Sequence, residues 1–251
     1  MMVPFVNDNL IAKFKRGDLE LSIRLTPRLQ KIADQVIEGD VVADIGTDHG
    51  YIPIYLLKNK ISPFVIAGDI NEKPLESAEN NIKKYSLSDK AETRLGSGLS
   101  ILKPGEVDTV IVAGMGGLLI SDLLTTSKKV VEKLNTLILQ PMQAQPELRK
   151  YLINNGFTIE KDILVKEDHH IYEIIVAKHG IQEIRDQICY EIGFHINSNP
   201  KPLAIEYING KIRATKMVIE NISNNASEPS VEKLKEMNVK LKKLEEVLEC
   251  L

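Results

Sequence analysis

The sequence lacks any apolar stretch approaching the roughly 20 residues that a membrane-spanning helix needs. It also shows no apolar core of a signal peptide near its N-terminus. Cysteine is scarce, because Cys189 and Cys250 are too few and too far apart in the sequence for a disulfide framework or a zinc site. We therefore expect a cytoplasmic protein with no membrane segment and no bound metal.

Neither sign of charge dominates the composition. The chain has 32 Lys and Arg residues against 35 Asp and Glu residues, a formal net charge of −3, so composition alone does not indicate a nucleic-acid-binding protein. A length of 251 residues can hold one α/β domain of about 180 residues and an appendage. Residues 1–31 nevertheless contain six basic residues against three acidic ones, a local surplus of positive charge.

The dinucleotide-binding fingerprint G-x-G-x-x-G is also absent from the most informative segment, residues 41–56. Apolar β-branched residues there lead through a turn containing Gly46 and Gly50 into an apolar, helix-like stretch. Asp48 and Tyr51 stand where the second and third glycines of the fingerprint belong. The pattern Asp-x-Gly-x-x-x-Gly instead looks like the first motif of class I S-adenosylmethionine-dependent methyltransferases. A strand-ending turn without a ligand is the alternative interpretation.

Further apolar segments predict a seven-stranded, Rossmann-like α/β sheet. After the first strand we expect strands at residues 64–67, 91–95, 108–113, 137–139, 158–165 and 171–177, with helices between the earlier ones. Only five residues separate the last two strands, so these must form an antiparallel hairpin. Asp69 ends the second strand, a position where an acidic residue commonly binds ribose hydroxyls.

Helical spacing of apolar residues marks both ends of the chain. Residues 21–37 predict an amphipathic helix, with a kink or a helix start at Pro27. Beyond residue 200, the spacing predicts two helices that fold back as an antiparallel coiled-coil hairpin. We therefore divide the chain into a cofactor-binding domain with an N-terminal helical segment, residues 1–180, and a helical coiled-coil domain, residues 181–251. The hairpin could support its own chain, form a homodimer or hold a long substrate.

The whole chain resembles the bacterial tRNA (adenine(22)-N(1))-methyltransferases, which methylate N1 of an adenine in the D arm of tRNA. The motifs that carry the resemblance are Leu-Ser-Ile-Arg-Leu at 21–25, Ala-Asp-Ile-Gly-Thr-Asp-His-Gly at 43–50, Ala-Gly-Met-Gly-Gly at 113–117, Leu-Ile-Leu-Gln-Pro at 137–141 and Tyr-Glu at 172–173. The resemblance implies a class I methyltransferase fold, S-adenosyl-L-methionine as the cofactor and tRNA as the partner. One departure is Ser97, where the family usually has Asp; that carboxylate would accept a hydrogen bond from the adenine of the cofactor.

The resemblance also implies a cofactor site along the strand ends. Its expected residues are Asp44, Gly46, Thr47 and Gly50 toward the methionine end, Asp69 and Ile70 at the ribose, Ser97, Gly98 and Leu99 at the adenine, and Ala113, Gly114, Met115 and Gly116 on the side of the acceptor base. Methylation of adenine N1 creates a positive charge, which a nearby carboxylate would stabilise. Asp48 is the first candidate, with His49 and Gln140 as base-contacting groups. Alternatively, Asp48 caps the helix or binds the ammonium of the cofactor, and His49 only supports the loop.

Binding of tRNA phosphates is expected from the basic residues near the N-terminus, which are Arg24, Arg28, Lys13, Lys15 and Arg16. A solvated helix face is the alternative interpretation of these charges. Two other functions stay open at this point. One is a class I methyltransferase that acts on a small molecule or a protein, and the other is a cofactor-binding or coiled-coil interaction module without turnover.

Overall fold

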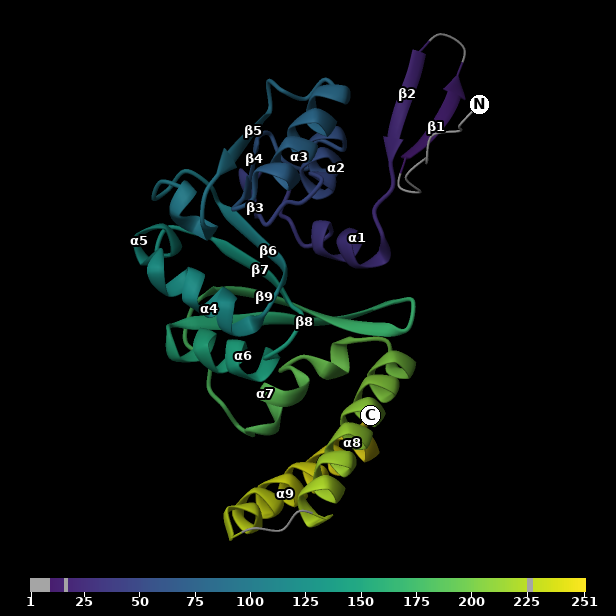
Figure 1. Cartoon of the computed structure of the whole chain (residues 1–251), viewed down its shortest axis with the longest axis vertical. Coiled ribbons are helices and arrows are strands. Elements are labelled where there is room, and N and C mark those ends of the chain that lie inside the picture. Colours follow the sequence, from purple (N-terminus) through teal and green to yellow (C-terminus); the bar gives the residue numbers. More distant parts are fainter. Residues whose placement is uncertain (1–9, 16–17, 225–227) are drawn as a thin grey trace.

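The computed structural model describes residues 10–15, 18–224 and 228–251, and its centre is a seven-stranded sheet (Figure 1). The strand order is β5-β4-β3-β6-β7-β9-β8. The first five strands in this order are parallel, whereas β9 is antiparallel to both β7 and β8. The strands are β3 (Val42–Ile45), β4 (Val65–Asp69), β5 (Ala91–Leu95), β6 (Thr109–Met115), β7 (Thr136–Pro141), β8 (Phe157–Glu167) and β9 (His170–His179). The predicted sheet with its terminal hairpin is therefore confirmed.

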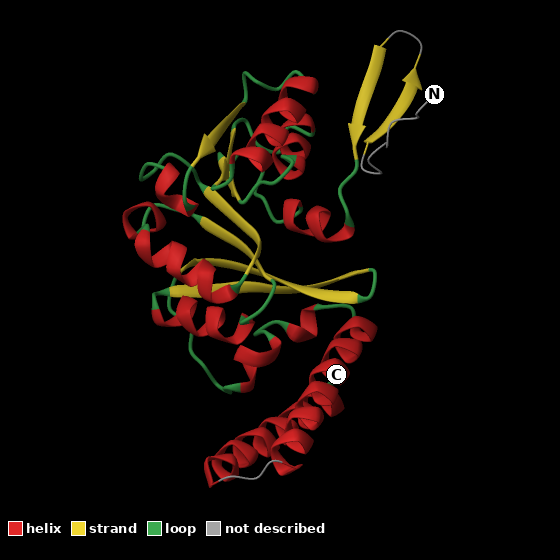
Figure 2. Cartoon of the chain, in the orientation of Figure 1, coloured by secondary structure: helices red, strands yellow, loops and turns green. Residues whose placement is uncertain are grey.

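Helices cover both faces of this sheet (Figure 2). In β7, Leu137 and Leu139 pack toward α4 and α6, whereas Ile138 packs toward α1 and α2. Successive residues of a strand point to opposite faces, so a strand covered on both sides must be apolar throughout. The helices around the sheet are α1 (Pro27–Ala33), α2 (Tyr51–Lys58), α3 (Glu72–Lys84), α4 (Gly117–Thr126), α5 (Lys128–Val131) and α6 (Gln145–Asn154), with a short 3-10 helix η1 (Gly98–Ile101) after β5.

The N-terminal part of the chain differs from the prediction in its secondary structure. A single helix over residues 21–37 is wrong, because strand β1 (Leu10–Lys15) pairs with β2 (Asp18–Ile23) in an antiparallel hairpin. Helix α1 begins at Pro27, where the fixed backbone angle of proline and its missing N–H suit a first helical turn. The Thr26 hydroxyl accepts a hydrogen bond from Leu29 N at 3.5 Å and caps the helix.

The C-terminal segment forms two long helices, α8 (Lys201–Asn224) and α9 (Glu228–Cys250), which pack together and run in opposite directions (Figure 1). Ile208, Ile212 and Leu244 are buried, as the helical spacing predicts. The ends of these helices nearest the sheet share a core with α7 (Ile188–Ile192), η2 (Ile196–Ser198) and Leu164 of β8. The packed hairpin is confirmed, whereas its supercoiling stays a prediction.

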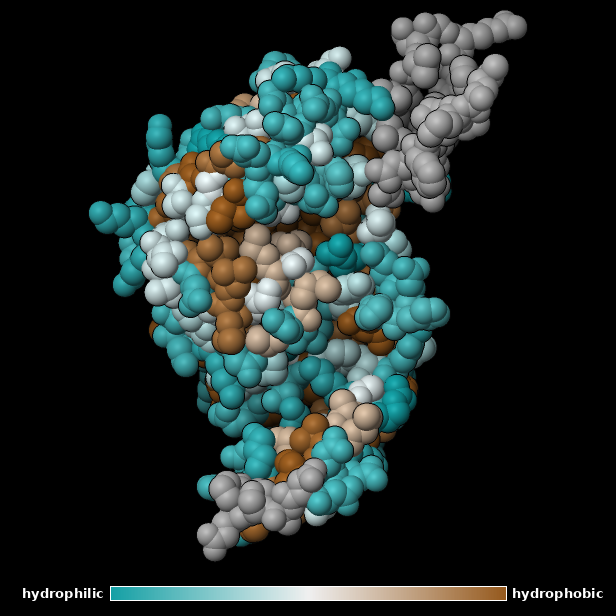
Figure 3. Space-filling model, viewed as in Figure 1, coloured by the Kyte–Doolittle hydropathy of each residue, from teal (hydrophilic) through white to brown (hydrophobic). Residues whose placement is uncertain are grey.

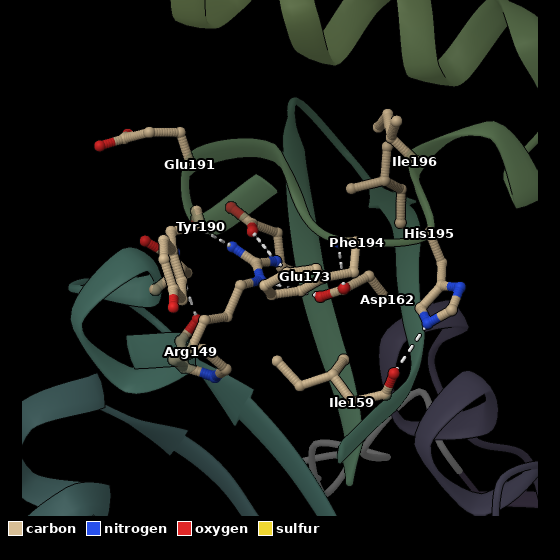
Figure 4. A network of polar contacts seen from close by, with 12 residues as sticks. Arg149, Ile159, Asp162, Glu173, Tyr190, Glu191, Phe194, His195 and Ile196 are labelled. Atoms are coloured by element: carbon tan, nitrogen blue, oxygen red, sulfur yellow. Dashed lines mark hydrogen bonds and ion pairs between the residues drawn. The ribbon is translucent and has the colours of Figure 1, made fainter. Parts of the chain in front are cut away.

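A buried ionic network joins this C-terminal segment to the sheet (Figure 4). The Arg149 guanidinium of α6 donates to Asp162 Oδ1 at 2.9 Å, to Glu173 Oε2 at 2.7 Å and to the Tyr190 carbonyl oxygen at 3.0 Å. Burial alone would raise the pKa of Glu173, but the charges of Arg149 and Lys211 outweigh it and lower that pKa. Since Asp162 and Glu173 lie on β8 and β9, this one arginine of α6 links two strands of the sheet to α7.

No helix within the described ranges is long and apolar enough to span a bilayer. The same residues contain no cluster of three or more His, Cys, Asp or Glu side chains that could hold a metal ion. Cys189 and Cys250 both have free thiols.

Candidate functional site

The turns that follow β3, β4 and β6 meet at one edge of the sheet, because parallel strands end together there. Gly46 is at the centre of this edge, and its amide and that of Thr47 both donate to the Gly68 carbonyl oxygen, at 2.8 and 3.1 Å. The backbone of Gly46 has a φ of +80°, and an added Cβ would lie 2.7 Å from Met115 Cε. The backbone angle therefore favours glycine here, and any larger residue would also displace the flexible end of Met115.

Two pockets open on either side of Gly46, and we call them the larger and the smaller pocket. The larger has a volume of about 420 Å³ and is lined by Thr26, Arg28, Leu29, Asp44, Gly46, Thr47, Asp48, Tyr51, Ile52, Ala113, Gly114 and Glu167. The smaller has a volume of about 190 Å³ and is lined by Ile45, Gly46, Asp69, Ile70, Asn71, Gly96, Ser97, Gly98, Met115, Leu119 and Leu123. Polar groups dominate the first lining and apolar groups the second.

Asp44 is the most perturbed acid of the larger pocket. Burial raises its pKa to about 6, and the Asp69 and Asp48 carboxylates act in the same direction, while Thr47 opposes the shift. Thr47 Oγ1 is buried, yet it completes no hydrogen bond of good geometry with the described residues. The Thr47 hydroxyl therefore lies beside Asp44 and can still form a hydrogen bond with a ligand. A cationic ligand would stabilise the ionised form of Asp44.

The smaller pocket combines one carboxylate with an apolar slot. Asp69 Oδ1 accepts from Asn71 N at 2.8 Å, which fixes the carboxylate at the end of β4. Ile70, with 65% of its surface exposed, and Leu119, with 50%, border the pocket. Figure 3 shows an apolar patch over the region of α4, the helix that carries Leu119. Such a slot beside a carboxylate suits a flat ring joined to a ribose.

Arg28 lies in the wall of the larger pocket that is not formed by the strand-end turns, and it connects several elements there. Its Nη1 donates to Gln140 Oε1 at 2.7 Å, and its Cζ lies 5.2 Å from the centroid of the Tyr172 ring. Its backbone amide donates to Glu167 Oε2 at 2.8 Å. These contacts bring α1, the end of β7 and the tip of the β8–β9 hairpin together at one point.

The structure brings most of the predicted cofactor residues together. Ten of the thirteen line one or both pockets: Asp44, Gly46, Thr47, Ala113 and Gly114 line the larger, and Gly46, Asp69, Ile70, Ser97, Gly98 and Met115 line the smaller. The other three lie behind the lining. Gly50 precedes α2, Gly116 precedes α4, and Leu99 is fully buried in the core.

The three predicted catalytic residues occupy different environments. Asp48 lines the larger pocket, but 70% of its side chain is exposed. His49 lines neither pocket; its ring lies 5.4 Å from that of Tyr51, and its Nε2 is 3.7 Å from Asp48 Oδ1. Gln140 is fully buried and lines neither pocket; it accepts from Arg28 and pairs across the sheet with Ala113, both of which line the larger pocket.

The predicted phosphate-binding residues differ in their environments, and only two of their side chains are described. Arg24 is exposed, whereas Arg28 is engaged in the wall of the larger pocket. Arg16 lies outside the described residues, as do the side chains of Lys13 and Lys15.

Sequence reasoning missed Thr26, Leu29, Tyr51, Ile52 and Glu167 in the larger pocket. Tyr51 and Ile52 open the predicted helix after the glycine turn, so their position was the available signal. Glu167 belongs to the short connection between the last two strands, which the sequence analysis used only to infer an antiparallel hairpin. No local motif predicts that this connection reaches the pocket.

Comparisons with known proteins agree with this geometry. Residues 25–175 match a family described as a methyltransferase domain. The tRNA (adenine(22)-N(1))-methyltransferase of Bacillus subtilis is 31% identical over 90% of this chain and 98% of its own length. The crystal structure of the B. subtilis M1A22 tRNA methyltransferase TrmK superposes with a TM-score of 0.82, 32% identity and coverage of 90% and 99% of the two chains. The structure of M. capricolum TrmK with the cofactor product S-adenosylhomocysteine has a TM-score of 0.76, 27% identity and coverage of 90% and 98%.

Proposed function

Because the chain belongs to the family of bacterial tRNA (adenine(22)-N(1))-methyltransferases, we propose a division of the reaction between its two pockets. The enzyme transfers the methyl group of S-adenosyl-L-methionine to N1 of adenine 22 in the D arm of tRNA. The cofactor occupies the smaller pocket and the adjoining part of the larger one, and the acceptor adenine enters the rest of the larger pocket. Similarity over nearly the full length of a tRNA methyltransferase favours this function over a small-molecule or protein acceptor and over a non-catalytic module.

The residues at the strand ends fit the cofactor. Asp69 is positioned to accept from the ribose hydroxyls, and the apolar slot formed by Ile70, Leu119 and Leu123 fits an adenine ring. Ser97, at the edge of this slot, retains one hydroxyl acceptor where the family usually has a carboxylate. On the other side of Gly46, Asp44 and the neighbouring Thr47 hydroxyl suit the ammonium and carboxylate of the methionine end.

When bound, the cofactor supplies an electrophilic methyl group. The chain contributes orientation, because the two pockets meet at Gly46, which lines both of them. Positive charge develops on the adenine ring as N1 is methylated, so acidic groups in the larger pocket stabilise the product side of the reaction. The base must leave its stack to reach this pocket.

The three predicted catalytic residues receive different proposed roles. Asp48 stays a candidate to face the base, although its exposure weakens any electrostatic effect. Gln140 acts as a positioning residue, since it lines neither pocket and holds Arg28, which does. His49 lies outside both linings and supports the loop, accepting from Asn81 Nδ2 at its carbonyl oxygen at 2.9 Å.

We propose that tRNA approaches the edge of the sheet where α1, the glycine turns and the β8–β9 hairpin meet. Arg24 is exposed beside α1 and is positioned to contact phosphate. Lys13, Lys15 and Arg16 are proposed to extend this contact on the basis of sequence alone. Arg28 is assigned to the pocket wall instead, because its guanidinium is already engaged.

The C-terminal segment, residues 181–251, is proposed as a second domain that supports a long substrate or a second copy of the chain. Met217 and Val239 are 64% exposed on α8 and α9, which leaves apolar surface for a homodimer contact. A tRNA-modifying enzyme works where tRNA and S-adenosylmethionine are available, so we propose a cytoplasmic location.

The test of this function is methyl transfer from labelled S-adenosylmethionine to unmodified tRNA transcripts. The transcript with adenine at position 22 is expected to yield labelled 1-methyladenosine, whereas the same transcript with guanine there is expected to yield none. Equal labelling of both transcripts, or of neither while the cofactor binds, would contradict the proposed acceptor.

A further inference from the structure

Three acidic residues of the described chain line the larger pocket; Asp44 and Asp48 belong to β3 and the turn after it, whereas Glu167 comes from the β8–β9 hairpin. It ends β8, at the tip of the β8–β9 hairpin, 139 residues along the chain from Arg28. Its side chain is 19% exposed, far less than the 70% of Asp48. A charge held away from water interacts more strongly with a ligand, so Glu167 is better placed than Asp48 to act on a base.

The two oxygens of Glu167 have different partners. Oε2 accepts from the Arg28 amide at 2.8 Å, which fixes the carboxylate against the first turn of α1. Oε1 lies 3.9 Å from Arg28 Nε, too far for a hydrogen bond. Arg28 Nε is itself buried with no hydrogen-bond partner within the described part of the chain. One oxygen is thus held in place while the other can accept from a ligand.

The neighbours of Arg28 keep this arrangement rigid. The guanidinium donates to Gln140 Oε1 at 2.7 Å and lies over the Tyr172 ring, so Arg28 is held from two sides. Gln140 is fully buried at the end of β7. Since the Glu167 carboxylate accepts from the backbone amide of Arg28, the contacts that hold Arg28 also hold this carboxylate at the wall of the pocket.

Adenine has a chemical feature that matches a fixed acceptor. The exocyclic amino group at C6 adjoins N1 and donates hydrogen bonds, whereas guanine has a carbonyl oxygen, an acceptor, at the same place. Methyl transfer forms a bond between the methyl carbon and N1, breaks the sulfur–methyl bond, and moves the positive charge from sulfur to the ring. A carboxylate near the amino group would accept from it and stabilise that charge.

We propose that Glu167 determines the specificity for adenine by accepting a hydrogen bond from the 6-amino group of the acceptor base. Arg28, Gln140 and Tyr172 are positioning residues that hold Glu167 in place. This inference rests on the proposed function, because it assigns the acceptor adenine to the larger pocket.

The experiment compares two tRNA transcripts that differ only at position 22, one with adenosine and one with purine riboside, which lacks the amino group. For each enzyme form, the ratio of kcat/KM for the two transcripts is measured. The differing reactivity of the two bases cancels when the ratios of two enzyme forms are compared. The forms are wild type, Glu167→Ala, Glu167→Gln, which keeps the shape and an acceptor oxygen, and the control Glu160→Ala, an exposed acidic residue on the same strand.

We expect Glu167→Ala to reduce the preference for adenosine at least about tenfold, as for the loss of a hydrogen bond to a charged group. Glu167→Gln should give a smaller loss and Glu160→Ala none. In the presence of S-adenosylhomocysteine, the dissociation constants of the two transcripts should become most similar in Glu167→Ala, less so in Glu167→Gln, and should differ as in wild type in Glu160→Ala. A wild-type ratio in both Glu167 variants, with S-adenosylhomocysteine binding intact, would overturn the inference. Failure of wild type to methylate the adenosine transcript would instead contradict the proposed function.

Discussion

At the scale of single residues, the proposed role of Asp44 predicts that cofactor binding depends on pH. Burial raises the pKa of Asp44 to about 6, so the side chain is mostly neutral below that pH and ionised above it. The ammonium of the cofactor favours the ionised form. Affinity for S-adenosylmethionine should therefore rise about tenfold between pH 5 and pH 7, as the ionised fraction of a group with this pKa does.

Isothermal titration calorimetry across this pH range measures that dependence, and near pH 6 it should also detect release of a proton on binding. Asp44→Asn should bind more weakly and show a flat profile. Asp89→Asn, which changes an exposed residue outside both pockets, should behave as wild type. A flat profile for the wild-type protein would exclude Asp44 as the partner of the ammonium.

The residues of the glycine turns could be predicted from the sequence, but the opposite wall of the larger pocket could not. Asp44, Gly46 and Thr47 belong to one contiguous motif, so local pattern suffices to identify them. Glu167 and Arg28 are 139 positions apart, and their contact depends on where the β8–β9 hairpin tip and α1 meet. This contact is formed only in the tertiary structure, and neither segment contains a sequence motif that predicts it.

At the scale of elements, the sheet was predictable because β3, β4, β6 and β7 are apolar runs that end in a polar or glycine-containing turn, although β5 at the sheet edge is not such a run. The extent of the N-terminal helix was not predicted correctly, because residues 18–23 pair with the neighbouring residues 10–15, and this local strand pairing overrode the helical spacing. Pro27 was the usable signal, and it marks the first turn of α1.

The network around Arg149 shows how α6, α7 and the β8–β9 hairpin depend on one buried charge. Arg149→Met should lower the free energy of unfolding by about 3–5 kcal/mol, because Asp162 and Glu173 would stay buried without that cation. The matched control is Lys178→Met, which removes the cation of an exposed ion pair with Glu160 and should cost less than about 1 kcal/mol.

Urea denaturation of the two variants, followed by circular dichroism, gives both free energies. Equal costs for Arg149→Met and Lys178→Met would show that the buried network contributes no more than a surface pair. That outcome would also remove the reason for treating Arg149 as the link between the sheet and the C-terminal helices.

At the scale of the whole molecule, the sheet, the hairpin tip and α1 converge on a single edge, and Gly46 lies between the two pockets formed there. The C-terminal helices pack at the far side of β8 and share a core with Leu164. In the proposed arrangement, catalysis depends on elements drawn from most of the chain, and the donor and the acceptor meet beside one glycine.

The most direct test of this account compares Gly46→Ala with Gly105→Ala in methyl transfer to the adenine-22 transcript. Both glycines have a similar positive φ, +80° and +77°, so both substitutions impose similar backbone strain. At Gly46 the added Cβ would lie 2.7 Å from Met115 Cε, so the flexible end of Met115, which lines the smaller pocket, would have to shift, whereas nothing lies within 4 Å at Gly105. Gly46→Ala should lower kcat/KM about 100-fold through misplacement of the donor, with Gly105→Ala close to wild type. Equal activity of the two variants would contradict the placement of the reaction at Gly46.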